Sequence, residues 1–121
     1  MSKYRGDGSA AVQPVCAQRR DVLPGYEALA YVLDDALEQA QRGKGAVRHA
    51  SPGEHFCDQP IVRICEWLGD GGRSFVLGQA VKKALESARL HDDHARAELL
   101  GAINYLAAAV LLIDRRQGRD A

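Results

Sequence analysis

The chain has 121 residues, of which 46% are hydrophobic and 26% charged, a composition typical of one soluble domain with a substantial core. Sixteen basic and sixteen acidic residues cancel at neutral pH, so no overall field draws the protein to nucleic acid or to anionic lipid. Aromatic residues make up only 6%, which argues against a surface on which nucleic-acid bases stack.

Residues 1–24 predict an irregular arm, because glycine and proline recur there without a sustained apolar period. The arm contains no apolar stretch long enough for a secretory signal, so we expect a cytoplasmic protein. The three cysteines, Cys16, Cys57 and Cys65, fit the reduced thiols of that compartment better than a disulfide framework.

An all-α domain is expected over residues 25–117, and its first helix begins at Gly25. The apolar residues of this helix recur at three- and four-residue spacing and are Leu29, Val32, Leu33, Ala36, Leu37 and Ala40. Gly43 and Gly45 end the helix. Its opposite face is acidic and contains Glu27, Asp34, Asp35 and Glu38.

Residues 48–61, RHASPGEHFCDQPI, form a polar loop that leads into a short second helix. Ser-Pro-Gly at 51–53 is typical of a turn. We expect Asp58 at the N-cap and Pro60 in the first helical turn. The apolar face of this helix contains Ile61, Ile64, Cys65 and Leu68, and the helix ends in the Gly-Asp-Gly-Gly of residues 69–72.

Ser74 is the expected cap of a third helix over residues 75–90, and Asp92 or Asp93 that of a last helix that runs to about Arg116. The apolar face of the third helix contains Leu77, Val81, Ala84, Leu85 and Ala88. The last helix holds an uncharged run of 15 residues, 99–113, which is shorter than the ~20 that cross a bilayer. We therefore expect no membrane insertion.

The last helix is apolar on most of its circumference, so we expect it to be buried centrally or against another subunit of a homo-oligomer. No segment alternates with period two for long enough to be a strand. The predicted fold is therefore all-α, a small four-helix bundle-like domain with an irregular N-terminal arm and a tail at residues 118–121.

The polar loop and nearby lysines supply the candidate ligand-binding residues. These are Lys44, Arg48, His49, Glu54, His55, Lys82 and Lys83. The cations would gather round a phosphate, and the glycines beside Lys44 would let the backbone approach it. We assign no metal, cofactor or catalytic residue. His49, His55, Cys57 and Cys65 are of types that zinc accepts, but their spacing matches no strong zinc pattern.

Two alternatives would make the protein a metal-dependent nucleotide hydrolase. His91–Asp92 is similar to the metal-binding doublet of HD-type phosphohydrolases, although helix capping also explains it. Residues 34–38, DDALE, with Glu98 resemble the acidic helices of MazG-like pyrophosphohydrolases. Gly101 stands where their second motif has an aspartate, so a ligand is missing and we favour a non-enzymatic protein.

The segments FVLGQAVKKALES and AELLGAINYLAAAVLLI are similar to small phage proteins of the SaV-like family. The residues in comparable places are Phe75, Gly78, Gln79, Val81, Lys82, Leu99, Ala102, Tyr105 and Leu106. Gln79 replaces the family's asparagine and Lys83 an aromatic residue. The resemblance implies a phage or prophage accessory protein. Together with the apolar last helix, it predicts a homo-oligomer that binds a host protein or a small phosphorylated ligand.

Overall fold

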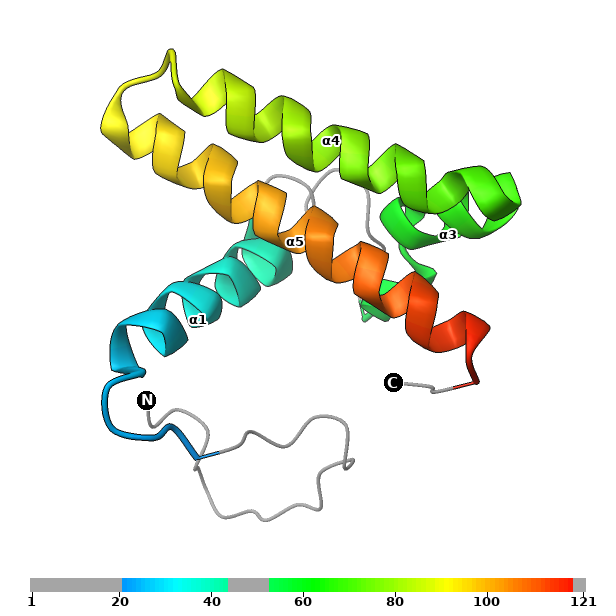
Figure 1. Ribbon diagram of the computed structural model, residues 1–121, viewed down its shortest axis with the longest axis horizontal. Helices are drawn as coiled ribbons and strands as arrows, with labels where there is room; N and C mark the ends of the chain where they lie inside the picture. The colour runs from blue at the N-terminus through cyan, green and yellow to red at the C-terminus, as the bar shows by residue number, and fades with distance from the viewer. Residues whose placement is uncertain (1–20, 44–52, 119–121) are drawn as a thin grey trace.

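The computed structural model describes residues 21–43 and 53–118. All regular elements within these two ranges are helical, which confirms the all-α class. They are α1 (Glu27–Arg42), the 3-10 turn η3 (Phe56–Asp58), α3 (Pro60–Leu68), the 3-10 turn η4 (Gly69–Gly71), α4 (Gly72–Ser87) and α5 (Asp92–Arg116). Helices α4 and α5 form an antiparallel hairpin, α1 crosses the middle of α5, and α3 packs near the start of α4 (Figure 1).

The bounds of α1 agree with the apolar period to within two residues. Gly25 lies outside the helix at φ +96°, a left-handed conformation that glycine adopts without strain. Its N–H donates to Oε1 of Glu27 at 3.0 Å, so the first helical side chain holds the turn that precedes it. At the other end Gly43 terminates the helix as predicted. Gly45 lies outside the described residues.

Three predicted helix caps are wrong. Asp58 belongs to η3, and Gln59 is the N-cap of α3, although Pro60 is the first helical residue as expected. Ser74 lies inside α4, which begins three residues earlier than predicted because η4 leads directly into it. His91 is the N-cap of α5. None of these N-cap residues makes a side-chain cap hydrogen bond, so backbone turns, and not capping side chains, decide where the helices begin.

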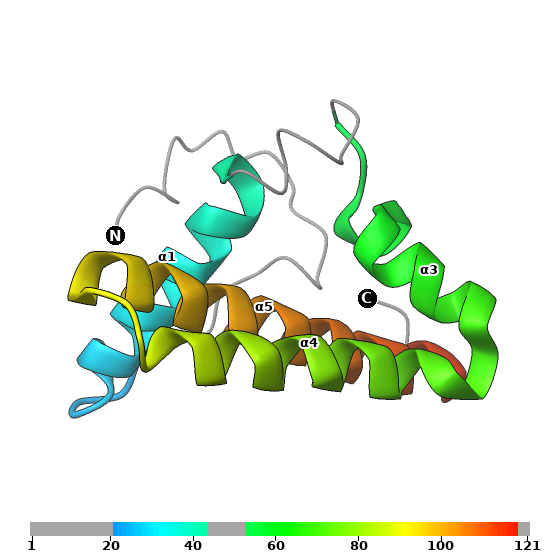
Figure 2. The same ribbon diagram turned by 90° about the horizontal axis from the view of Figure 1, so that it is seen from above.

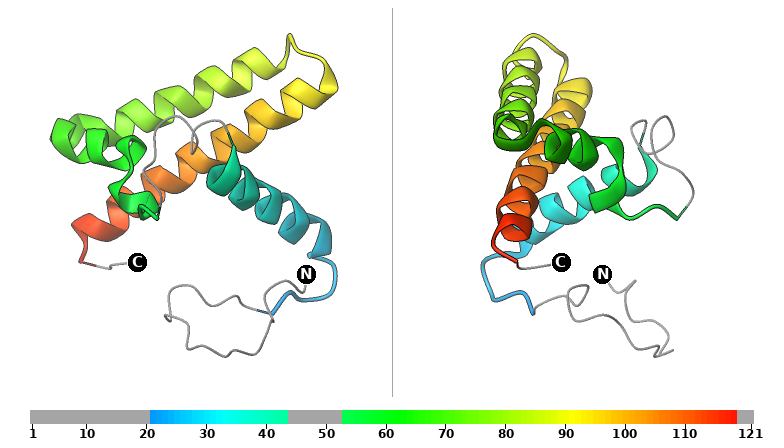
Figure 3. Two further views of the ribbon diagram at one scale, coloured as in Figure 1. Left: turned by 180° about the vertical axis from the view of Figure 1, so that it is seen from behind. Right: turned by 90° about the vertical axis from the view of Figure 1, so that its right-hand side faces the viewer.

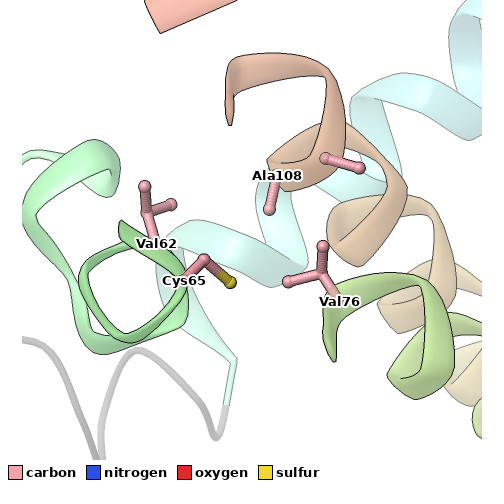
Figure 4. Close-up of a cluster of buried hydrophobic side chains, with 5 residues drawn as sticks. Val62, Cys65, Val76 and Ala108 are labelled. Carbon is pink, nitrogen blue, oxygen red and sulfur yellow. The ribbon is translucent and has the colours of Figure 1, made fainter. Parts of the chain in front are cut away.

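The core lies where α3 meets the α4–α5 hairpin (Figure 4). Its buried residues are Val62, Cys65, Val76, Ala108 and Ala109, and partly buried Phe56, Ile61, Tyr105 and Leu112 pack against them. Cys65 is a core residue, as predicted, and its Sγ donates to the carbonyl of Ile61 at 3.1 Å. Burial, and to a smaller extent the neighbouring Glu66 carboxylate, raises the pKa of the Cys65 thiol.

Polar contacts join α1 to α5. The amide of Asn104 donates through Nδ2 to the carbonyl of Ala36 at 3.0 Å, and Nε2 of Gln39 donates to the carbonyl of Ala97 at 3.0 Å. The side chain of Arg96 donates to Asp35 at 2.7 Å. Ala36 is the one residue of α1 that is fully buried. Apolar burial therefore contributes little to the α1–α5 contact.

Helices α1 and α3 lie on the same side of the α4–α5 hairpin. Figure 2 shows both rising from one side of the hairpin, and the end-on view in Figure 3 shows the same arrangement. The opposite side of the hairpin is not covered by any element that the structure describes. The side chains on that uncovered side therefore face solvent.

Candidate interaction surface

The uncovered side of the hairpin is apolar. We call it the hairpin face and define it by Leu77, Val81, Ala84 and Leu85 of α4, Ala88 at the C-cap of α4, and Leu99, Ile103, Leu106 and Val110 of α5. On each helix these residues recur at three- and four-residue steps, which places them on one side. Leu85 is 68% exposed, Val81 57% and Val110 56%. Large aliphatic side chains left this open cost free energy in water, which favours a covering partner.

The residues predicted to bury α4 point outward instead. The fully buried residues of α4 are Gly72, Val76 and Ala80, none of which belongs to the predicted apolar face. Those of α5 are Leu100, Ala102, Ala108 and Ala109, so most of this helix is not buried within the chain. Small side chains allow the two helix axes to approach closely, and that close contact leaves no space for the larger residues between them.

A second row of exposed apolar residues lies on α1. Leu29, Leu33 and Leu37 follow at four-residue steps and are each about half exposed. The packed side of α1 carries Asp35, Ala36 and Gln39, which contact α5. Helix α1 therefore presents the leucines of its predicted apolar stripe to solvent, whereas Ala36 of the same stripe is buried against the rest of the protein.

The proposed phosphate site is only partly within the described residues, since Lys44, Arg48 and His49 lie outside them. Glu54 and exposed His55 lead into η3 and α3. Lys82 and Lys83 lie on α4, where Nζ of Lys82 is 3.9 Å from Glu86 and Nζ of Lys83 is 3.2 Å from Glu98. Lys83 also lies over the Tyr105 ring, 6.0 Å from its centroid. Both lysines thus have carboxylate partners, which reduces the charge they offer to a phosphate.

Three carboxylates of the hydrolase alternative form ion pairs with basic side chains. Asp35 contacts Arg96 at 2.7 Å, Glu38 contacts Arg42 at 3.2 Å and Glu98 contacts Lys83 at 3.2 Å. The hydrogen bond that Arg96 donates to Asp35 raises the pKa of the Arg96 guanidinium. Over residues 21–43 and 53–118, no group of three or more His, Cys, Asp or Glu side chains is placed to hold a metal ion.

A shallow hollow that sequence reasoning missed lies between the ends of α3 and α5. Its volume is about 480 Å³, and it is lined by Cys65, Glu66, Gly69, Asp70, Arg73, Leu112, Ile113, Arg115 and Arg116. Nε of Arg115 is 2.9 Å from Glu66, and a terminal guanidinium nitrogen of Arg116 is 3.4 Å from Asp70. No local motif marks these residues, because they come from segments far apart in the chain. Two of the three arginines are offset by carboxylates, so the hollow is a weaker candidate than the hairpin face.

Within residues 21–43 and 53–118, α5 is the one helix that is long and apolar enough to cross a bilayer, by length and composition only. Its most apolar window has a mean hydropathy of 1.6, and 22% of that window is buried. Other sides of α5 nevertheless contact α4 and α1 through polar side chains. Glu98 contacts Lys83, and Asn104 donates to the carbonyl of Ala36. Insertion of α5 into lipid would break these contacts.

Comparisons of the chain with protein-family models, with curated proteins and with solved structures find no match.

Proposed function

We propose that the chain is a small non-enzymatic accessory protein of phage or prophage type, which works in the cytoplasm by self-association and by binding a protein partner. The hairpin face is the observation that carries this proposal. It places six large aliphatic side chains that are 42% to 68% exposed on one side of the hairpin, whereas soluble monomers seldom expose large contiguous apolar patches.

The resemblance to SaV-like phage proteins supports the same surface. Val81, Leu99 and Leu106, which belong to that resemblance, all lie on the hairpin face. Leu99 and Leu106 are 45% and 47% exposed, so burial within the chain does not account for them. In this proposal the four helices act as one bundle-like domain whose uncovered side is completed by a partner.

The mass of the full chain in solution tests the proposal. Sedimentation equilibrium should give a multiple of 13.1 kDa for the unaltered protein and a lower mass for Leu106→Glu, because a buried charge at an apolar interface is strongly unfavourable. Leu68→Glu is the matched control, since Leu68 is 45% exposed but lies on α3, on the other side of the hairpin. This control should keep the mass of the unaltered protein.

Circular dichroism of each variant checks that the helices are retained. A strictly monomeric unaltered protein at high micromolar concentration would contradict self-association. Equal masses for Leu106→Glu and the unaltered oligomer would place the contact on another surface.

Binding of a small phosphorylated ligand is tested separately by thermal shift with inorganic phosphate. Any stabilisation by phosphate should be lost in the Lys82→Ala variant.

A further inference from the structure

We propose that a second copy of the chain covers the hairpin face, with α5 of one protomer antiparallel to α5 of its partner, so that two hairpins complete a four-helix bundle. This inference rests on the self-association proposed above and adds its geometry. A two-fold axis makes such a contact isologous, meaning that the same residues are buried on both protomers. The choice of partner and direction follows from the spacing, symmetry and charge of α5.

The spacing of the hairpin face on α5 is that of a helix–helix seam. Leu99, Ile103, Leu106 and Val110 follow one another at steps of four, three and four. Apolar residues alternating at these steps are the a and d positions of a heptad, whose side chains pack into holes on a facing helix. On α4, Leu77, Val81, Ala84 and Ala88 follow the same steps, so both helices of the hairpin present a seam.

The seam on α5 is symmetric about the middle of the helix. Leu99 and Val110 lie equally far from the midpoint between Ile103 and Leu106, and that midpoint is within one residue of the centre of Asp92–Arg116. A two-fold axis through it would pair Leu99 with Val110 of the partner and Ile103 with Leu106 of the partner. Two antiparallel copies of α5 would therefore overlap along their whole length, with Leu99, Ile103, Leu106 and Val110 each facing another of these four residues.

The charges at the ends of α5 select the antiparallel direction. Its first turn is acidic, with Asp92 and Asp93, and its last turn is basic, with Arg116 and with Arg115, whose Nε lies 2.9 Å from Glu66 of α3. Antiparallel pairing brings the acidic turn of each protomer beside the basic turn of the other, whereas parallel pairing brings like charges together. The existing contact of Arg116 with Asp70, at 3.4 Å and largely exposed, is weak enough to be shared with a second carboxylate.

Cysteine cross-linking of the full chain tests the geometry. Every protein carries Cys16→Ser and Cys57→Ser, and buried Cys65 is kept. A tagged Leu99→Cys protein and an untagged Val110→Cys protein are mixed, oxidised and compared with each protein oxidised alone. The mixed disulfide should exceed the Leu99→Cys homodimer by roughly ten-fold, because antiparallel pairing separates the two copies of residue 99 by about 16 Å along the axis and a disulfide needs Cα atoms within about 7 Å.

Each other outcome overturns the arrangement. Preferred linkage of Leu99→Cys to itself would show a parallel pair, and linkage of Leu99→Cys to Leu85→Cys would show α5 packed on α4 of the partner. Either result in a protein of dimeric mass would leave self-association standing and reject only the geometry. A monomer in sedimentation would reject both. A monomer that co-sediments with phosphatidylcholine–phosphatidylglycerol vesicles would identify lipid as the occupant of the hairpin face.

Discussion

Gly72, the first residue of α4, lies directly against the backbone of Cys65 in α3. A Cβ atom at Gly72 would overlap the carbonyl oxygen of Cys65 and crowd its carbonyl carbon and Cα. Backbone atoms cannot rotate out of the way as side chains can. The absence of a side chain at Gly72 therefore allows α3 to dock on the hairpin and to bring Val62 and Cys65 to Val76.

Gly72→Ala should destabilise the protein by about 3 kcal/mol, because α3 must move away from α4 and the core must open. Urea unfolding followed by circular dichroism measures the loss. Gly71→Ala is the control, since a Cβ at the neighbouring Gly71 meets nothing within 4 Å and its backbone is right-handed helical. The control should change stability by less than about 0.5 kcal/mol. Equal losses of unfolding free energy in Gly72→Ala and Gly71→Ala would mean that the close contact between Gly72 and Cys65 does not determine stability.

Asn104→Ala should loosen α1 specifically. The variant removes the hydrogen bond to the carbonyl of Ala36 and should cost about 1 kcal/mol. Amide hydrogen exchange should accelerate in α1 more than in α3, because few apolar contacts remain to hold α1. Uniform acceleration across all helices in Asn104→Ala would show that α1 does not open independently.

Arg96→Gln, which removes an exposed ion pair with Asp35, should lower the free energy of unfolding by less than about 1 kcal/mol, and by less still at high salt.

The Cys65 thiol should make stability depend on alkaline pH. Its pKa in the folded protein is raised above the ordinary value of 9.0 by burial and then by Glu66, so the folded state holds the thiol proton more tightly than the unfolded chain. The corresponding stability is fully present below pH 9 and is lost as pH rises through the folded-state pKa. Urea unfolding between pH 7 and pH 10 should show a steeper decline for the unaltered protein than for Cys65→Ala. Parallel declines would contradict this assignment.

Trp67 should remain open to solvent in the oligomer. It is the only tryptophan of the chain, it is 85% exposed, and it belongs to α3, which lies on the side opposite the hairpin face. Iodide quenching of its fluorescence should therefore be the same at concentrations where the protein is assembled and where it is dissociated. Stronger quenching after dilution would show that the partner covers α3 and not the hairpin.

The sequence alone determines the helical class and most helix limits, because periodicity and glycine breaks are local properties. Gly43 ends α1, Pro60 begins α3 and α5 runs to Arg116, all as the pattern predicts. The caps were wrong because Asp58, Ser74 and the aspartates of α5 are good capping types, whereas 3-10 turns and extended residues before the helices set the actual starts. Capping preference is worth about 1 kcal/mol, which tertiary packing readily exceeds.

Only the tertiary structure decided which side of each helix faces inward. An amphipathic pattern shows that Leu77, Val81 and Leu85 share a side, but it cannot distinguish a core within the chain from an interface with a partner. The close approach of α4 and α5 buries the smaller Val76 and Ala80 and leaves the larger residues outside. Local sequence thus determined the apolar stripe, and helix packing over long sequence distances decided that it became a surface.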